Sequence, residues 1–193
     1  LAAFDYLSSD SLDDLVVGFE NSFDAGGGLI IYEAASSLRG LGFGGSQTLS
    51  TTSPPTSVDP SEDEKDKDIP FAGSRRDGKA LAARRFSGRG PGLFLEDYPA
   101  GSSLGDVVLG DLNSDGLSDI ILTSSANNSI PILIQDSSNP GEFLPALQVP
   151  AGTSPSRITT MDFDDDGDND IATVTTNSAG SRIVRLLQND GNL

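Results

Sequence analysis

The sequence predicts an all-β fold built from four repeats of about 50 residues. Four aspartates, each leading into a short apolar run, recur at spacings of 54, 51 and 51 residues: Asp14, Asp68, Asp119 and Asp170. Each apolar run is followed by a turn-forming stretch and then by a second apolar run, which is typical of antiparallel strands. No long segment has the 3.6-residue apolar period of an amphipathic helix. These three observations together indicate an all-β chain.

Each repeat is expected to hold four short strands. The innermost strand precedes an acidic loop, as in 156–161, and the second strand begins at the aspartate itself. The third strand is the second apolar run, found at 29–32, 81–83, 130–134 and 183–187. A Gly-x-Phe segment precedes the outermost strand in the second and third repeats, at 92–94 and 141–143. Four short strands in about 50 residues correspond to one blade of a β-propeller.

The repeats are predicted at 1–47, 48–97, 98–149 and 150–193. The first two are degenerate, and the fourth is incomplete because it stops before the Phe and the outermost strand. Residues 48–60, rich in Ser, Thr and Pro, are predicted to be a loop or a linker. An array of blades that is left open exposes strand edges, which tend to pair with other strands. We therefore expect the chain to be part of a larger propeller, completed by further blades or by other protein chains. A closed four-bladed ring is the competing interpretation.

Two nine-residue stretches, 111–119 and 162–170, carry the same oxygen-rich pattern. Side-chain oxygens stand at positions 1, 3, 5 and 9, Gly at position 6 permits a sharp turn, and the position 7 carbonyl adds another oxygen. Six to eight oxygens are the usual coordination of Ca²⁺. A turn that binds no metal is the alternative, but two copies in phase favour two calcium sites. The predicted ligands are Asp111, Asn113, Asp115, Leu117 and Asp119 in one loop, and Asp162, Asp164, Asp166, Asp168 and Asp170 in the other.

These loops differ from an EF-hand, which needs a bidentate Glu at position 12 and a helix on each side. Position 12 is Leu122 in one copy and Thr173 in the other, within predicted strands. The first repeat has Tyr6 and Ser8 at positions 1 and 3, so we expect no ion there. The second repeat keeps acidic residues over 59–68 but loses the Gly and the register.

The repeated pattern resembles FG-GAP/VCBS-type repeats, the calcium-loop blades of integrin-like propellers and of many bacterial secreted proteins. Segments 129–145 and 162–170 carry the resemblance, which is specific over 98–193 and weaker over 1–97. It implies a β-propeller, calcium in the loop between the first two strands of a blade, and an extracellular, cell-surface or periplasmic location. It does not imply one function, because such blades occur in adhesins, receptors, lectin-like modules and enzyme accessory domains.

Composition narrows the classes of function. Twelve Lys and Arg against 29 Asp and Glu give a net charge of −17, which argues against nucleic acid and anionic membranes as partners. The chain has no Cys and no His, so it lacks thiolate chemistry and the commonest general base. No apolar run of 18 residues is present, and membrane insertion is not expected. Because no Ser/His/Asp or Cys/His set can be assembled, we do not expect an enzyme.

The favoured function is a calcium-stabilised structural or interaction module of a secreted or cell-surface assembly, with cell adhesion as one example. The alternative is a fragment of a propeller-type polysaccharide-active enzyme, or its carbohydrate-binding accessory domain, in which paired carboxylates act as acid and base. Eight of the twelve basic residues lie in 65–89 and could bind an acidic partner or a polysaccharide. Neutralisation of this basic segment by the acidic residues 59–68 is the favoured interpretation.

Overall fold

The computed structural model describes the backbone over residues 2–4, 14–20, 27–37, 40–51, 55–60, 71–75, 77–85, 93–139 and 141–191. Side chains are described over 72–75, 77–82, 95–139 and 141–191. Within these residues the chain forms fifteen strands and no helix, so the all-β prediction is confirmed. The described part of the chain also contains no helix capable of crossing a membrane.

The strands form four antiparallel sheets, in which neighbouring strands are also neighbours along the chain. The first sheet contains β1 (Ala2–Phe4), β2 (Asp14–Glu20), β3 (Gly27–Ser37) and β4 (Gly40–Thr51). The second contains β5 (Pro55–Pro60), β6 (Phe71–Arg75), β7 (Lys79–Arg85) and β8 (Leu93–Pro99). The third contains β9 (Leu104–Gly110), β10 (Asp119–Ser124), β11 (Ser129–Leu133) and β12 (Leu147–Pro150). The fourth contains β13 (Thr153–Met161), β14 (Asp170–Thr176) and β15 (Arg182–Leu187).

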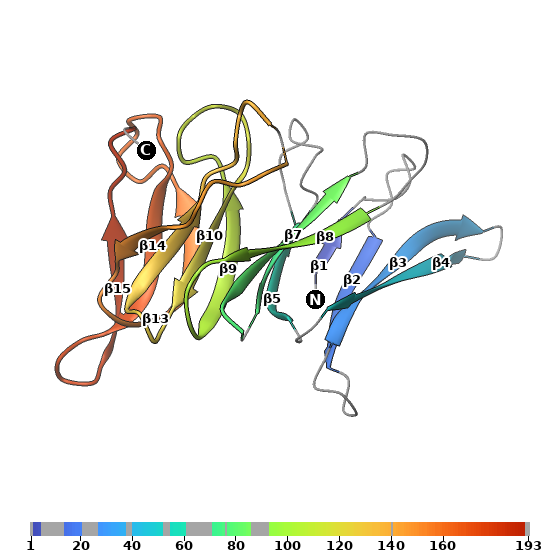
Figure 1. The fold of residues 1–193 in the computed structure, drawn as a ribbon, viewed down its shortest axis with the longest axis horizontal. Helices are drawn as coiled ribbons and strands as arrows, with labels where there is room; N and C mark the ends of the chain where they lie inside the picture. The colour runs from blue at the N-terminus through green and yellow to red at the C-terminus, as the bar shows by residue number, and fades with distance from the viewer. Residues whose placement is uncertain are drawn as a thin grey trace.

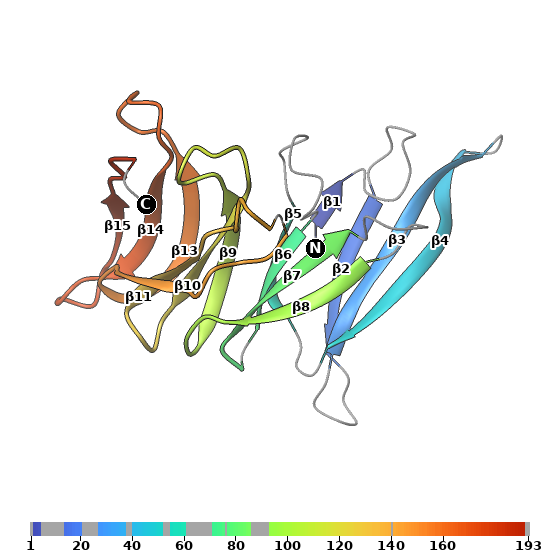
Figure 2. The ribbon, with the colours of Figure 1, turned by 45° about the horizontal axis from the view of Figure 1, so that its top comes forward.

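The four sheets lie side by side in chain order, with the first and fourth sheets at opposite ends of the array (Figures 1 and 2). The first strand of each sheet contacts the first strand of the next, so that β1 contacts β5, β5 contacts β9, and β9 contacts β13. This arrangement places the loop that follows each first strand at one end of its sheet. The loops at 111–118 and 162–169 therefore belong to neighbouring sheets.

The prediction of a loop or linker at 48–60 is wrong for most of these residues, which lie in strands. Residues 48–51 are the end of β4, and β5 covers Pro55–Pro60. In β5, Pro55 and Pro60 pair with Arg75 and Phe71 of the neighbouring β6. Proline is compatible with this strand because β5 forms the edge of its sheet, and both prolines lie at the ends of the strand.

An apolar cluster packs the second sheet against the third. The second sheet contributes small residues, which allow close approach, and the third contributes larger ones: Ala72, Ala80, Ala82, Leu104, Val107, Ile120, Leu122, Leu133 and Phe143, with Ala100 between the sheets. The ring of Tyr98 meets that of Phe143 edge to face at a centroid distance of 5.2 Å. Burial of this surface holds the two sheets together.

A second apolar cluster packs the third sheet against the fourth. It consists of Leu112, Ile121, Ile130, Ile132, Ala151 and Ile171, with Ile158 and Leu187 partly buried against it. The two first strands approach closely at Gly110, where an added Cβ would lie 2.8 Å from the hydroxyl oxygen of Thr160. This contact positions the two acidic loops next to each other.

Among the described side chains of the basic segment, Arg75 is a buried cation. Arg75 is 1% exposed and forms ion pairs with Asp97 and, at 2.7 Å, with Asp77. Lys79 lies 3.4 Å from the carboxylate of Asp97. The described basic side chains of segment 65–89, Arg75 and Lys79, are thus paired with Asp77 in the turn after β6 and with Asp97 in β8. The side chains of the acidic residues 59–68, expected to neutralise this segment, lie outside the described residues.

Candidate metal centre

The acidic loops of the third and fourth repeats adopt the same backbone conformation. Position 4 has a left-handed φ in both, 58° at Ser114 and 60° at Asp165. The glycines at position 6, Gly116 and Gly167, have φ values of 84° and 97°. No atom lies within 4 Å of a Cβ built at either glycine, so glycine is favoured there by backbone conformation and not by lack of space.

The carboxylate at position 1 organises each loop. Asp111 accepts the backbone N–H of Asp115 at 3.2 Å and that of Gly116 at 2.8 Å. Asp162 accepts the equivalent N–H groups at 3.2 and 3.0 Å. Each bond leaves lone pairs on the carboxylate oxygens, because a carboxylate offers about four acceptor sites. Position 1 can therefore hold the loop and still ligate a cation.

The carboxylate at position 5 receives the backbone N–H of position 7. Asp115 accepts from Leu117 at 2.9 Å, and Asp166 accepts from Asp168 at 3.0 Å. In the third repeat, the side chain of Asn113 also donates to Asp115 at 3.1 Å. Positions 1, 5 and 7 are thus linked within a single tight turn in both loops, and in the third repeat position 3 joins them.

The carboxylate at position 9 is buried and braces the loop against its sheet. Asp119 is 0% exposed and accepts the backbone N–H of Leu112 at 3.0 Å and that of Gln135 at 2.9 Å. Asp170 makes the equivalent bonds at 3.0 and 2.8 Å. Burial raises the pKa of Asp119 to about 7, despite these two N–H bonds, which lower it.

Three carboxylates converge in the fourth repeat. Asp162, Asp164 and Asp166 each present one oxygen such that all three oxygens lie within 4.8 Å of one another. The N–H bond from Asp168 lowers the pKa of Asp166, but desolvation and repulsion by the neighbouring carboxylates outweigh it and raise the pKa overall. Such a cluster repels itself until a cation is bound.

The residues present fit a calcium ion. The side chains at positions 1, 3, 5 and 9 can all ligate a metal through oxygen atoms, and Ca²⁺ prefers oxygen ligands. Of the predicted ligands in the fourth repeat, the structure brings Asp162, Asp164 and Asp166 into one group, whereas Asp170 is outside it and binds backbone N–H groups. In the third repeat Asn113 replaces one carboxylate, which leaves Asp111 and Asp115 as the charged groups of the turn.

Comparison with known families agrees with this geometry. Residues 111–173 match the family model of the FG-GAP-like repeat. This part of the chain, 63 of its 193 residues, is similar to an FG-GAP-like repeat. The match spans both acidic loops and the strands between them, and it confirms the resemblance predicted from the sequence. No curated protein and no solved structure gives a significant match. FG-GAP-like repeats indicate β-propeller-type interaction modules and typically occur in extracellular proteins.

The two acidic loops bind each other directly, and a residue that follows β15 also binds the third-repeat loop. The hydroxyl of Ser114 donates to the Asp168 carboxylate at 3.0 Å, and the amide of Asn169 donates to the backbone oxygen of Asp111 at 2.9 Å. The amide of Asn189 donates to the backbone oxygen of Leu112 at 2.6 Å. These three polar residues were not predicted as part of the site.

Sequence reasoning missed them because their partners lie in the neighbouring repeat. Asn169 stands at position 8 of its loop, where the ligand pattern requires no particular residue. Asn189 is outside the loop altogether, 19 residues after Asp170. The one feature of the sequence that could have indicated these contacts is the side-chain amide of Asn169 and of Asn189, which can donate to a backbone carbonyl.

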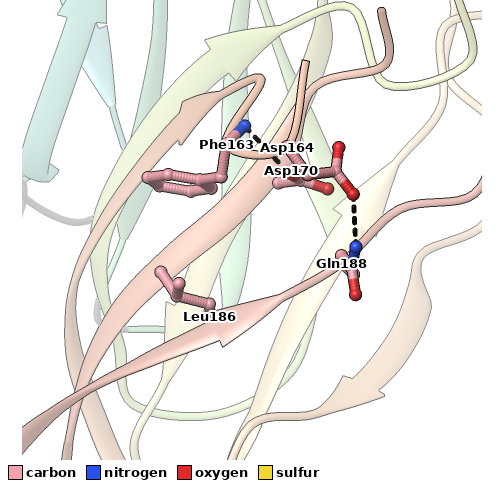
Figure 3. A pocket seen from close by; sticks show the side chains of 5 residues that line it. All are labelled: Phe163, Asp164, Asp170, Leu186 and Gln188. Carbon is pink, nitrogen blue, oxygen red and sulfur yellow. Dashed lines mark hydrogen bonds between the residues drawn. The ribbon is translucent and has the colours of Figure 1, made fainter. Parts of the chain in front are cut away.

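A pocket of about 220 Å³ opens beside the fourth-repeat loop, on the fourth sheet (Figure 3). It is lined by Phe163, Asp164, Asp170, Leu186 and Gln188. The amide of Gln188 donates to the carboxylate of Asp164. The pocket therefore joins two of the predicted calcium ligands, Asp164 and Asp170, to an apolar surface formed by Phe163 and Leu186.

Proposed function

We propose that this protein is a calcium-stabilised structural and interaction module of a secreted or cell-surface assembly. One observation carries the proposal: two acidic loops 51 residues apart repeat the same hydrogen bonds, from position 1 to position 9. A turn that merely reverses the chain needs no side-chain oxygen at all of positions 1, 3, 5 and 9. Repetition of that full set suits two sites for the same hard cation.

The four sheets are proposed to be blades of a propeller-type array. Each is a meander in chain order, and adjacent sheets contact through their first strands. In a propeller, the first strand of each blade lies next to the central axis. The side-by-side arrangement in Figure 2 is consistent with consecutive blades. Further blades or other protein chains are the expected partners of such an array.

Calcium would stabilise the junction between the third and fourth sheets. Both loops lie at this junction and contact each other through Ser114 and Asn169, while Asn189, which follows β15, donates to the third-repeat loop. Each Ca²⁺ would supply two positive charges to a chain of net charge −17, where the carboxylates otherwise repel. Binding should therefore be coupled to ordering of the loops. The fourth-repeat loop should bind more tightly, since more of its ligands are charged.

In this proposal the protein acts by binding and not by catalysis. The carboxylates of the two loops are engaged in N–H bonds that fix the loop conformation. Their remaining acceptor sites suit an ion, whereas an acid and a base in polysaccharide cleavage must be free to exchange protons.

Calorimetry with two matched variants tests the proposal. Asp164→Asn removes a charge from the converging group, whereas Asp165→Asn removes the same charge one residue later, outside that group. Asn tolerates the left-handed φ of 60° at position 165. We expect two calcium sites in the unmodified protein, a loss of about tenfold or more in affinity at one of them for Asp164→Asn, and little change for Asp165→Asn. Equal weakening in both variants, or binding weaker than roughly 1 mM in the unmodified chain, would contradict the proposal.

A further inference from the structure

The hydrogen bonds between the two acidic loops run in both directions. The hydroxyl of Ser114, at position 4 of the third-repeat loop, donates to the carboxylate of Asp168 at 3.0 Å. The side-chain amide of Asn169, at position 8 of the fourth-repeat loop, donates to the backbone oxygen of Asp111 at 2.9 Å. Each loop therefore supplies one donor to the other. We call these two hydrogen bonds the loop ties.

The loop ties attach to predicted ligand residues through atoms that those residues do not need for an ion. Asp168 is predicted to ligate calcium through its backbone carbonyl, and it accepts its tie with the carboxylate. Asp111 is predicted to ligate calcium through its carboxylate, and it accepts its tie with the backbone oxygen. Both ties can therefore persist when both loops hold an ion.

Each loop tie depends on the folded conformation of both loops. Ser114 has a left-handed φ of 58°, which residues other than glycine adopt mainly in turns, and its neighbours Asn113 and Asp115 are predicted ligands. Asp168 donates its backbone N–H to Asp166 at 3.0 Å. A loss of order in either loop would move the donor or the acceptor and break the tie.

The bases of the two loops are held by a shared frame. The backbone N–H of Asn189 donates to Asp170 at 2.8 Å. Its side-chain amide donates to the backbone oxygens of Leu112 at 2.6 Å and of Asn169 at 3.2 Å. Leu112 is also buried in the apolar cluster between the third and fourth sheets. Because this frame holds the bases, the parts left for calcium to order are the exposed turns, and the loop ties join those turns.

Binding at one loop should favour binding at the other. In the fourth repeat, three carboxylate oxygens lie within 4.8 Å of one another and repel without an ion. Ordering a loop therefore has a free-energy cost that ion binding must offset. A loop that is already ordered presents its tie to the second loop, whose ordering then costs less. The carboxylates of each loop carry at least two negative charges, so an occupied loop has no net positive charge to repel the second ion.

We propose that the two loops bind calcium with positive cooperativity, and that the loop ties carry the coupling. This inference deepens the proposed function and rests on it, because it requires calcium at both loops. Coupling between two sites is reciprocal and usually changes affinity by about 5- to 150-fold. The loop ties are only two hydrogen bonds, and Ser114 is exposed, so we expect a factor near the lower end, about tenfold. The junction between the third and fourth sheets would then become ordered over a narrow range of calcium concentration.

Calorimetric titration with Ca²⁺ measures the coupling factor. Two single-site variants give the affinity of each loop while the other is disabled. Asp111→Asn/Asp115→Asn disables the third-repeat loop, and Asp164→Asn/Asp166→Asn disables the fourth-repeat loop. The coupling factor is the product of the two stepwise association constants of the unmodified chain, divided by the product of the two single-site constants. We expect a factor of about 10, whereas a factor indistinguishable from one, or below one, overturns the inference.

A matched pair of serine variants tests whether the loop ties are the cause. Ser114→Ala removes one donor without removing a predicted ligand, whereas Ser178→Ala removes an exposed hydroxyl from the turn between β14 and β15. Ser114→Ala should lower the coupling factor by about threefold, since it removes one of two ties. Ser114→Ala/Asn169→Ala should bring the factor close to one, and Ser178→Ala should leave it unchanged. Equal factors in these last two chains overturn the inference. Circular dichroism verifies folding, and Ser114→Gly, which suits the left-handed φ, replaces Ser114→Ala if that variant is unfolded.

Hydrogen exchange gives a second readout, on the disabled loop itself. In Asp164→Asn/Asp166→Asn, calcium fills only the third-repeat loop. It should nevertheless slow exchange at the amide of Gly167, which is hydrogen-bonded within the fourth-repeat loop, by about tenfold. This slowing should disappear when both loop ties are also removed. Exchange at Gly167 that does not respond to calcium overturns the inference.

The titrations also separate this inference from the proposed function. Two ions bound without coupling would overturn only the inference. No ion bound at either loop would overturn the proposed function as well.

Discussion

Replacing the buried carboxylate of Asp119 should unfold the third-repeat loop. In Asp119→Ala the N–H groups of Leu112 and Gln135 lose their acceptors, and both bonds are buried. Each buried N–H left unpaired costs about 1–3 kcal/mol, so the variant should lose about 2–6 kcal/mol of stability. Asp119→Asn keeps one acceptor oxygen and should lose about half as much.

Urea unfolding without calcium, followed by circular dichroism, measures this loss. With a slope near 2 kcal/mol per molar urea, the midpoint of Asp119→Ala should fall by about 1–3 M. Hydrogen exchange at the amides of Leu112 and Gln135 should accelerate together, since these are the two donors. Asp165→Asn is the control, because it alters an exposed aspartate in the other loop. A midpoint for Asp119→Ala equal to that of the control, with both amides still protected, would refute the bracing role.

Three further predictions concern the same region. Burial raises the pKa of Asp119 to about 7 from an ordinary value of 3.8, so the calcium-free folded chain holds a proton that the unfolded chain releases. The corresponding stability should be complete below pH 4 and lost as the pH rises to about 7; Asp119→Asn should remove this slope from urea midpoints measured across that range. Gly167→Ala should cost about 1 kcal/mol in thermal unfolding, because φ is 97° and the added Cβ meets no atom; a loss near zero would show that the loop relaxes. Asn189→Ala removes the bond to the Leu112 carbonyl and should cost roughly 1 kcal/mol; unchanged exchange at the third-repeat loop would contradict a link between the loops.

The loop conformation could be predicted from the sequence because it is set locally. Position 1 carboxylates bind N–H groups only four and five residues away, and glycine at position 6 supplies the turn. The role of position 9 could not be predicted in this way. Asp119 binds Gln135, 16 residues later in the chain, so its burial depends on how the sheet pairs. The sequence pattern assigns every aspartate of the loop the same role, that of a metal ligand, and does not distinguish the buried position 9 from the exposed positions.

The contacts between sheets were also beyond the sequence. Asn189 reaches the backbone of Leu112, 77 residues earlier, and this depends on the packing of the fourth sheet on the third. The strand β5 was missed for a related reason. Its Ser, Thr and Pro residues favour loops locally, but pairing with β6 overrides that preference at the sheet edge.

Anomalous diffraction from crystals grown in calcium tests the central claim most directly. We predict two calcium peaks, one in loop 111–119 and one in loop 162–170, with the second bound by Asp162, Asp164 and Asp166. No peak is expected in the first repeat, where Tyr6 and Ser8 replace the ligands. Absence of a peak from both acidic loops, or a peak in the first repeat alone, would contradict the account.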